Sequence, residues 1–208
     1  MKTSYNGYPA SPDPDLIHVV PFVVNGVPFP GGVREGDVHT VLHYFAEQFD
    51  LRVEKLSADL GCWGFAYRQN RNADNLSCHA SGTAIDLNAV RHPNGKRRTF
   101  TREQVAEIRK ILAELDGVVR WGGDFGTVDE MHAEVSASPA LVAIVARRLT
   151  SPPTPTKDDV MSPAQEAKLD RVIDLLERLV APRRPDHKDT VPGEISLGDV
   201  LNKIEEKA

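Results

Sequence analysis

Two histidines and one aspartate are the residues of this sequence best suited to chemistry. His79 and Asp86 lie in the stretch SCHASGTAIDLN (77–88), and His132 follows in DEMHAEV (129–135). Two imidazoles and one carboxylate are a recurring ligand set for a catalytic zinc ion that keeps its fourth position open for water. The three side chains are therefore candidate ligands of one Zn²⁺ ion.

A simpler interpretation of the same residues stays open. A single histidine is more often a hydrogen-bonded structural residue than a metal ligand, and the spacing between His79 and Asp86 is less specific than a paired Cys-x-x-Cys motif. On the residues alone, a noncatalytic binding module is the alternative to a metalloenzyme.

Hydrolysis at a zinc ion also needs a base that takes a proton from water and passes it to the leaving group. Asp129 precedes His132 by three residues, and a turn there could bring its carboxylate over the metal. Glu130 is the rival, because on a strand its side chain would share the face of His132. The residues alone leave both candidates open.

Further polar residues near these stretches are candidates for binding a substrate. Arg68 carries a guanidinium that is always charged and donates in a planar fork, so it suits a carbonyl or carboxylate group. Glu134 could accept a hydrogen bond from a ligand imidazole and orient it. The candidates for the rim and wall of a pocket are Ser77, Ser81, Trp121 and Asp124.

Composition restricts the classes of partner. The 208 residues are 40% hydrophobic and 26% charged, with a net charge of −5, which gives no basic signature for nucleic acid. No apolar run approaches the roughly 18 residues that span a bilayer, so no membrane insertion is expected. The first fifteen residues lack the apolar core of a signal peptide, so no secretory address is expected.

Cys62 and Cys78 do not form a disulfide framework, and whether they pair is left open.

The candidate ligands need strands and turns to position them. Asn25-Gly26 favours a type I′ hairpin turn, and the alternation of Ile85 and Leu87 with Asp86 predicts a strand that points the acid away from its apolar neighbours. The arm 4–16 is expected to be irregular. The predicted strands are a hairpin over 19–29, then 83–88, 118–121 and 131–135.

Three helices are predicted around these strands, over 37–49, 101–116 and 139–149. The motif Thr101-x-x-Gln104 is a capping box, which marks the start of the second helix. His39 and His43 are four residues apart on the first helix, but they have no third partner nearby and are expected at the surface or the edge of the core.

Composition also predicts the domain organisation. Residues 1–150 are expected to form one domain, a Pro/Thr-rich linker covers 151–161, and residues 162–208 form a helical tail of unknown role. Apolar residues at heptad spacing in 163–180 predict a helix that either makes a homo-oligomer or packs back on the first domain. These residues are Leu169, Val172, Leu176 and Leu179.

Three motifs carry a resemblance to a known family. SCHASGTAIDLN resembles the S-x-H-x-x-G-x-A-x-D motif of the M15 zinc peptidases, which include D-alanyl-D-alanine carboxypeptidases, dipeptidases and the L-alanyl-D-glutamate endopeptidases of phage endolysins. VDEMHAEV (128–135) resembles their closing acid-x-x-His motif, and RWGGDFG (120–126) is similar to a stretch of the phage members. The run from NGYPASPD to about Val135 resembles endolysins of phages that infect actinobacteria. The resemblance covers roughly the first 150 residues.

The resemblance implies a zinc peptidase domain over 1–150 with an α+β fold, in which helices pack on a small antiparallel sheet that carries the ligands. It implies one zinc ion bound by His79, Asp86 and His132. Asp129 falls on the catalytic acid of the family, which favours it over Glu130, and Arg68 falls on the substrate-binding arginine. One departure is Ala133, where the family usually has an aromatic residue.

The resemblance also implies a function. We expect a phage endolysin that hydrolyses an amide bond in the stem peptide or cross-link of bacterial peptidoglycan by zinc-hydroxide attack. Such an enzyme would stay in the host cytoplasm until lysis and then act on the cell wall. The alternatives are a D,D-carboxypeptidase that removes a terminal D-alanine, and a noncatalytic cell-wall-binding or virion protein.

Overall fold

The computed structural model describes residues 1–70, 75–151, 167–168 and 170–172. The chain divides into two units, residues 1–153 and 154–208. In the second unit the described residues are helical. Apart from Ser151 and Val172, the predicted linker and the predicted heptad seam lie outside the described residues. None of the helices in the described part is long and apolar enough to cross a membrane.

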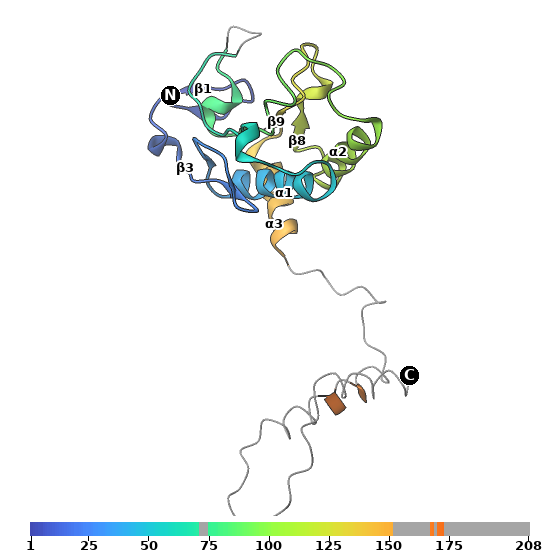
Figure 1. Ribbon diagram of the computed structural model, residues 1–208. Coiled ribbons are helices and arrows are strands. Elements are labelled where there is room, and N and C mark those ends of the chain that lie inside the picture. The colour runs from blue at the N-terminus through green and yellow to red at the C-terminus, as the bar shows by residue number, and fades with distance from the viewer. Residues whose placement is uncertain (71–74, 152–166, 169, 173–208) are drawn as a thin grey trace, which may run out of the picture. The chain divides into compact units, whose positions relative to one another are not determined.

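The first unit is an α+β structure, as predicted (Figure 1). Its central sheet is antiparallel and three-stranded, in the order β7 (Ala84–Asp86), β9 (His132–Val135), β8 (Val119–Trp121). Helix α1 packs against both other α-helices of this unit and against β9. The helices are α1 (Asp37–Arg52), α2 (Arg102–Glu114) and α3 (Pro139–Thr150).

One face of the central sheet is apolar and the other is polar. On β9, Ala133 and Val135 belong to the hydrophobic core, whereas His132 and Glu134 point to the opposite face. On β7, Ile85 points into the same core. Because side chains alternate along a strand, this short sheet can close the core on one face and present polar groups on the other.

Short two-stranded ladders and 3-10 turns complete the unit. The ladders are β1 (Lys2–Thr3) with β2 (Pro9–Ala10), β3 (Val19–Val20) with β6 (Val33–Arg34), and β4 (Val23–Val24) with β5 (Val27–Pro28). The 3-10 turns are η1 (Asp15–Ile17), η2 (Ala58–Leu60), η3 (Cys78–Ser81) and η4 (Gly122–Asp124).

The hairpin predicted over 19–29 forms only in its inner part. Asn25 and Gly26 have φ values of 49° and 84°, as a type I′ turn requires, and join β4 to β5. The outer residues of the predicted strand pair instead with β6, further along the chain.

Local signals place the helices where they were predicted. The Thr101 hydroxyl accepts a hydrogen bond from the Gln104 backbone, and the Gln104 side chain accepts one from the Thr101 backbone, so α2 begins with a complete capping box. Helix α1 buries its predicted face, and it runs three residues beyond the predicted end at Phe49. His39 and His43 lie half-buried against Phe22 at the edge of the core.

The backbone of the N-terminal arm is mostly irregular, as expected, but the arm is held against the rest of the unit. Ser4 Oγ donates to Ser81 Oγ at 2.7 Å. Asn6 Nδ2 donates to both Thr83 Oγ1 and the Val135 carbonyl, each at 2.8 Å. These contacts tie the arm to η3 and to the end of β9.

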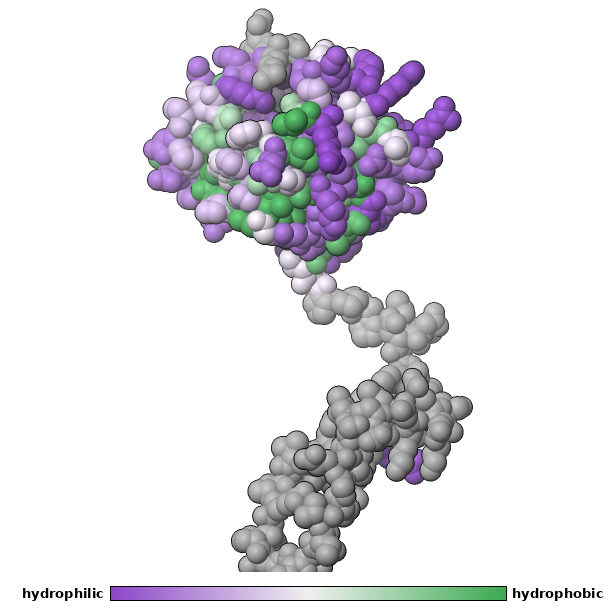
Figure 2. Space-filling model, in the orientation of Figure 1, coloured by the Kyte–Doolittle hydropathy of each residue, from purple (hydrophilic) through white to green (hydrophobic). Residues whose placement is uncertain are grey.

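Two further observations concern the surface and the thiols. Hydrophobic residues interleave with hydrophilic ones on the face shown in Figure 2 and form no continuous apolar band there. Cys62 and Cys78 are buried free thiols, so the two do not form a disulfide.

Candidate metal centre

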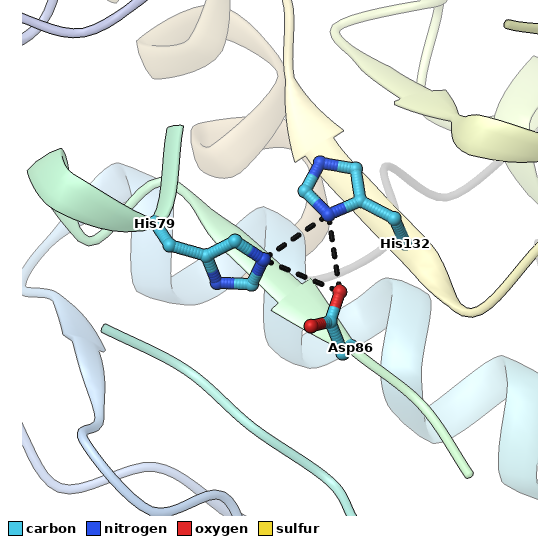
Figure 3. Close-up of side chains that lie close together, drawn as sticks. All are labelled: His79, Asp86 and His132. Atoms are coloured by element: carbon cyan, nitrogen blue, oxygen red, sulfur yellow. Dashed lines mark hydrogen bonds and ion pairs between the residues drawn. The ribbon is translucent and has the colours of Figure 1, made fainter. Parts of the chain in front are cut away.

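Three side chains point toward one another on the polar face of the central sheet (Figure 3). His79 Nε2 lies 3.2 Å from Asp86 Oδ1 and 3.1 Å from His132 Nδ1, and His132 Nδ1 lies 3.1 Å from Asp86 Oδ1. All three residues are buried. Within the described residues, they are the one group of three or more histidine, cysteine or acidic side chains close enough to share a metal ion.

Strand pairing and a short 3-10 turn position the three candidate ligands. Asp86 and His132 are paired directly across β7 and β9, so the strand register brings them together. His79 lies in η3, and its backbone N–H donates to Ser77 Oγ, which caps this turn. Gly82 ends η3 with a φ of 68°, and a Cβ there would lie 2.8 Å from the Arg34 backbone nitrogen. Only glycine fits this sharp return into β7 without strain.

The outer nitrogens of the two imidazoles fix which atoms face the centre. His79 Nδ1 lies 2.7 Å from the Gly64 carbonyl oxygen, and His132 Nε2 lies 2.8 Å from Glu134 Oε2. A carbonyl or an ionised carboxylate only accepts hydrogen bonds, so these outer nitrogens carry the protons. In neutral imidazoles, the inner nitrogens then present lone pairs.

The donor set fits a zinc ion. In the neutral form, two imidazole lone pairs and one carboxylate oxygen converge on the same point, which is unfavourable unless a metal ion or a proton lies between them. Tetrahedral zinc with bonds of about 2.0–2.2 Å keeps its ligand atoms about 3.3–3.6 Å apart. The observed separations of 3.1–3.2 Å are close to that spacing.

Electrostatics at this point also favour a cation. Burial opposes the charge of His132, but hydrogen bonds with Asp86 and Glu134 outweigh it and raise the pKa of this imidazole to about 10. Burial alone would raise the pKa of Glu134, but His132 and other neighbours lower it to about 2. Two buried carboxylates thus surround one imidazole, and the metal-free centre attracts positive charge.

Asp129 lies beside the centre in a tight turn. Its carbonyl accepts a hydrogen bond from the His132 backbone at 3.0 Å, and its own backbone donates to the Gly122 carbonyl at 2.9 Å. Burial raises the pKa of the Asp129 carboxyl, and Oδ1 has no hydrogen-bond partner among the described residues. A raised pKa makes this carboxyl a better proton acceptor, as a general base requires.

Glu130 faces away from the centre. Its carboxylate accepts hydrogen bonds from the backbone of Arg98 at 2.8 Å and of Thr99 at 2.7 Å. Burial would raise the pKa of Glu130, but these hydrogen bonds and that of the Thr99 hydroxyl lower it. Residues 130 and 131 precede β9, so the strand geometry that would have placed Glu130 beside His132 does not apply.

Two cavities flank the metal centre. The first has a volume of about 520 Å³ and contains His132 and Asp129 in its lining. The second, of about 480 Å³, contains His79 and Asp86. Arg68 lines both cavities. The centre therefore lies between two spaces, with one arginine common to both.

The remaining predicted residues divide between the cavity and the interior. Ser77 and Asp124 line the first cavity, and Asp124 also pairs with Arg109 at 2.7 Å. Trp121 does not form a cavity wall, because its indole is 4% exposed and donates to the Glu130 carbonyl. Ser81 is fully buried rather than at the rim.

Ala133, where the M15 family usually has an aromatic residue, does not line either cavity. Ala133 is buried in the hydrophobic core, on the face of β9 opposite His132. An aromatic side chain at this position would extend into the hydrophobic core and would not reach the metal ligands on the opposite face.

Several cavity residues carried no recognised signal in the sequence. Arg120 is flanked on β8 by the core residues Val119 and Trp121, so strand alternation would have placed it on the polar face. Tyr5 and Asn94 have no local pattern that marks them, and only the tertiary structure brings them to the first cavity.

One comparison with known proteins bears on this site. Residues 71–135 match a family model of the M15 peptidases described as D-alanyl-D-alanine carboxypeptidase. The matched segment is under a third of the chain, but it contains all three candidate ligands and Asp129. This match supports an M15-type peptidase. Neither the curated proteins nor the solved structures gave a match to the chain.

Proposed function

We propose that this protein is a zinc-dependent peptidoglycan peptidase of the phage endolysin type, which hydrolyses an amide bond in the stem peptide or cross-link. The observation that carries the proposal is the convergence of His79, Asp86 and His132 within 3.2 Å of one another, beside a partly buried acid. The match to the peptidase family supports the same reaction class.

Each residue of the centre has a role in this reaction. When bound, zinc would lower the pKa of a water molecule and polarise the scissile carbonyl. His79, Asp86 and His132 hold the ion, and Glu134 orients the His132 ring through its hydrogen bond. Asp129 accepts the proton of the attacking water and passes it to the leaving amine.

Arg68 orients the substrate. Arg68 lines both cavities, so it can contact a peptide bound on either side of the metal centre. A planar, permanently charged donor fork suits a peptide carbonyl or a side-chain carboxylate of the stem peptide. Ser77, with its hydroxyl oriented by the His79 backbone, and Asp124 contribute to the same wall.

The two cavities favour an endopeptidase. A carboxypeptidase needs a pocket that ends just beyond the scissile bond, whereas a bond inside a longer peptide needs space on both sides. Here space extends on the His132 side and on the His79 side of the centre. The second candidate, a D,D-carboxypeptidase, is supported by the description of the matching family model.

Mass spectrometry of digested cell walls tests the proposal. We expect the wild-type protein to release stem peptides or open cross-links, and to lose this activity with a chelator or in His132→Ala. His43→Ala is the matched control, because it removes a histidine outside the centre. Clearing of walls by the chelated protein would contradict a metal mechanism.

Two other outcomes would support the alternatives. Loss of a single alanine from each stem would favour the carboxypeptidase. Wall binding without hydrolysis in either wild-type protein or His132→Ala would favour the noncatalytic module.

The cellular setting and the tail are part of the proposal. Peptidoglycan is the partner, and the enzyme is held in the host cytoplasm until lysis gives it access to the wall. For the tail, homo-oligomerisation through 163–180 is one hypothesis. Light scattering of the full chain and of a chain ending at Thr150 tests it, since an unchanged oligomeric state would exclude this role.

A further inference from the structure

Arg120 holds the carboxylate that orients a metal ligand. Arg120 and Glu134 are directly paired across β8 and β9, on the polar face of the sheet. Both Nε, at 2.7 Å, and Nη2 of Arg120 donate to Glu134 Oε1. The other oxygen, Oε2, accepts the hydrogen bond of His132 Nε2 at 2.8 Å. Each oxygen of Glu134 therefore has its own partner.

Arg120 is itself held between two aromatic rings. Its guanidinium carbon lies 5.0 Å from the centroid of Tyr5 and 4.7 Å from that of Phe125. Phe125 also lies beside His132, with ring centroids 5.9 Å apart. These cation–π contacts restrict the guanidinium to one position over the sheet.

Tyr5 belongs to the N-terminal arm, which the structure anchors on both sides of that residue. Ser4 and Asn6 hydrogen-bond to the segment that leads from His79 into β7, and Asn6 also bonds to the end of β9. The arm thus reaches the polar face at the two segments that carry metal ligands. Tyr5 lines the first cavity as a consequence.

We propose that Arg120, held by Tyr5 and Phe125, is a positioning residue for the metal ligand His132. Two N–H groups of Arg120 hold Oε1 of Glu134, so the carboxylate cannot rotate freely and Oε2 stays directed at the imidazole. Without Arg120, the 6% exposed carboxylate loses the partner of Oε1 and can rotate away from His132. This inference rests on the zinc ion of the proposed function and not on the hydrolytic reaction.

Zinc affinity tests the inference without any substrate. Competition with a chromogenic chelator would give the Kd of wild type, Arg120→Ala and Arg120→Lys. Loss of a partner outside the ligand sphere typically weakens metal binding about 10–100-fold, and we expect this for Arg120→Ala. Arg120→Lys keeps the charge but loses the fork, so its Kd should fall between those of Arg120→Ala and the wild type.

Arg52→Ala is the matched control. Arg52 on α1 pairs with Glu114 at 2.8 Å and with Glu107 at 3.1 Å, and none of the three residues lines either cavity. We expect its zinc affinity to match the wild type. Circular dichroism would show that each variant is folded. A folded Arg120→Ala with wild-type zinc affinity would overturn the inference, whereas a wild-type protein without zinc affinity would overturn the proposed function as well.

Steady-state kinetics separate positioning from direct substrate binding. With zinc in excess, Arg120→Ala should recover activity with an unchanged KM. An increased KM together with unchanged zinc affinity would make Arg120 a substrate ligand instead. Tyr5→Phe keeps the ring but loses the hydrogen bond to Arg120, so it should weaken zinc affinity less than Tyr5→Ala does. Unchanged affinity in Tyr5→Ala would remove the arm from this role.

Discussion

Asp86 and His132 lie directly opposite each other on β7 and β9, with Asp86 Oδ1 3.1 Å from His132 Nδ1. A shift of the strand register by one residue would turn one of these side chains to the core face. The candidate metal centre therefore forms only when the sheet is correctly paired, and zinc binding should be coupled to the folding of this sheet.

The first prediction concerns the stability that the metal supplies. Zinc at about 100 times its Kd should stabilise the protein by about 2.7 kcal/mol, because the unfolded chain lacks the assembled site. For a chain of this size, that corresponds to an increase in Tm of about 5–10 °C. Differential scanning calorimetry with and without a chelator would measure it. Asp86→Ala should show no zinc-dependent shift, and His43→Ala should show the full one.

Asp129→Asn separates metal binding from proton transfer. The amide cannot accept the proton of the attacking water, so kcat should fall about 10²–10⁴-fold. The three ligands are untouched, and metal analysis should still find one zinc ion per chain. An active Asp129→Asn would exclude this residue as the base. Glu130→Gln at wild-type kcat would show that the neighbouring acid is not involved in the reaction.

The raised pKa of Asp129 predicts a pH-dependent stability difference. Burial favours the neutral acid, so in the metal-free protein the ionised carboxylate opposes folding. This cost is absent below the ordinary pKa of an aspartate and develops as the pH rises through the raised value. In urea unfolding, metal-free Asp129→Asn should be more stable than the wild type at pH 7. The difference should vanish near pH 3, and a difference that grows on acidification would contradict this assignment.

Arg68→Ala should affect the substrate and spare the metal. A hydrogen bond to a charged group contributes about 1.5–3 kcal/mol, which corresponds to roughly a 10–150-fold loss of kcat/KM. Arg68 is not one of the three metal ligands, so zinc content should be unchanged. Arg68→Lys should recover only part of the loss, because an ammonium group lacks the planar fork. Steady-state kinetics on purified stem peptides would measure both.

Gly122 fixes the position of Asp129 through close packing. A Cβ on residue 122 would lie 2.2 Å from the Asp129 carbonyl oxygen, so the turn would have to move. Gly122→Ala should destabilise the protein by about 1–3 kcal/mol and lower kcat. Gly126→Ala is the matched control in the same loop, because its Cβ would meet no atom within 4 Å. Equal unfolding midpoints for the two variants would contradict the packing argument.

Local patterns predicted a large part of the fold. The capping box at Thr101 and the apolar period of residues 37–49 depend on near neighbours in the chain, and the helices formed there. The α+β class followed from the family resemblance, and the structure has it. The predicted ligands His79, Asp86 and His132 come together in the structure. For Asp86, the strand alternation in the sequence already indicated that its side chain points away from the apolar face.

Long-range contacts account for what the sequence did not reveal. Asn6 reaches Thr83 and Val135, and no local pattern marks such distant partners. Trp121 was expected at a pocket wall beside the glycine-rich turn, yet its strand position places it on the core face, whereas its neighbour Arg120 lies on the polar face. Ser81 was expected at the rim and is enclosed by the docked arm.

The alternation of core and polar side chains along β9 predicts how substitutions in this strand would affect folding and activity. In a saturation scan of residues 132–135, substitutions at Ala133 and Val135 should reduce the yield of folded protein, because these side chains fill the core. Substitutions at His132 and Glu134 should leave the yield largely intact while reducing peptidase activity. Along these four residues, sensitivity of folding and sensitivity of activity would therefore alternate with a two-residue period. The scan would distinguish residues needed for folding from residues needed for the reaction.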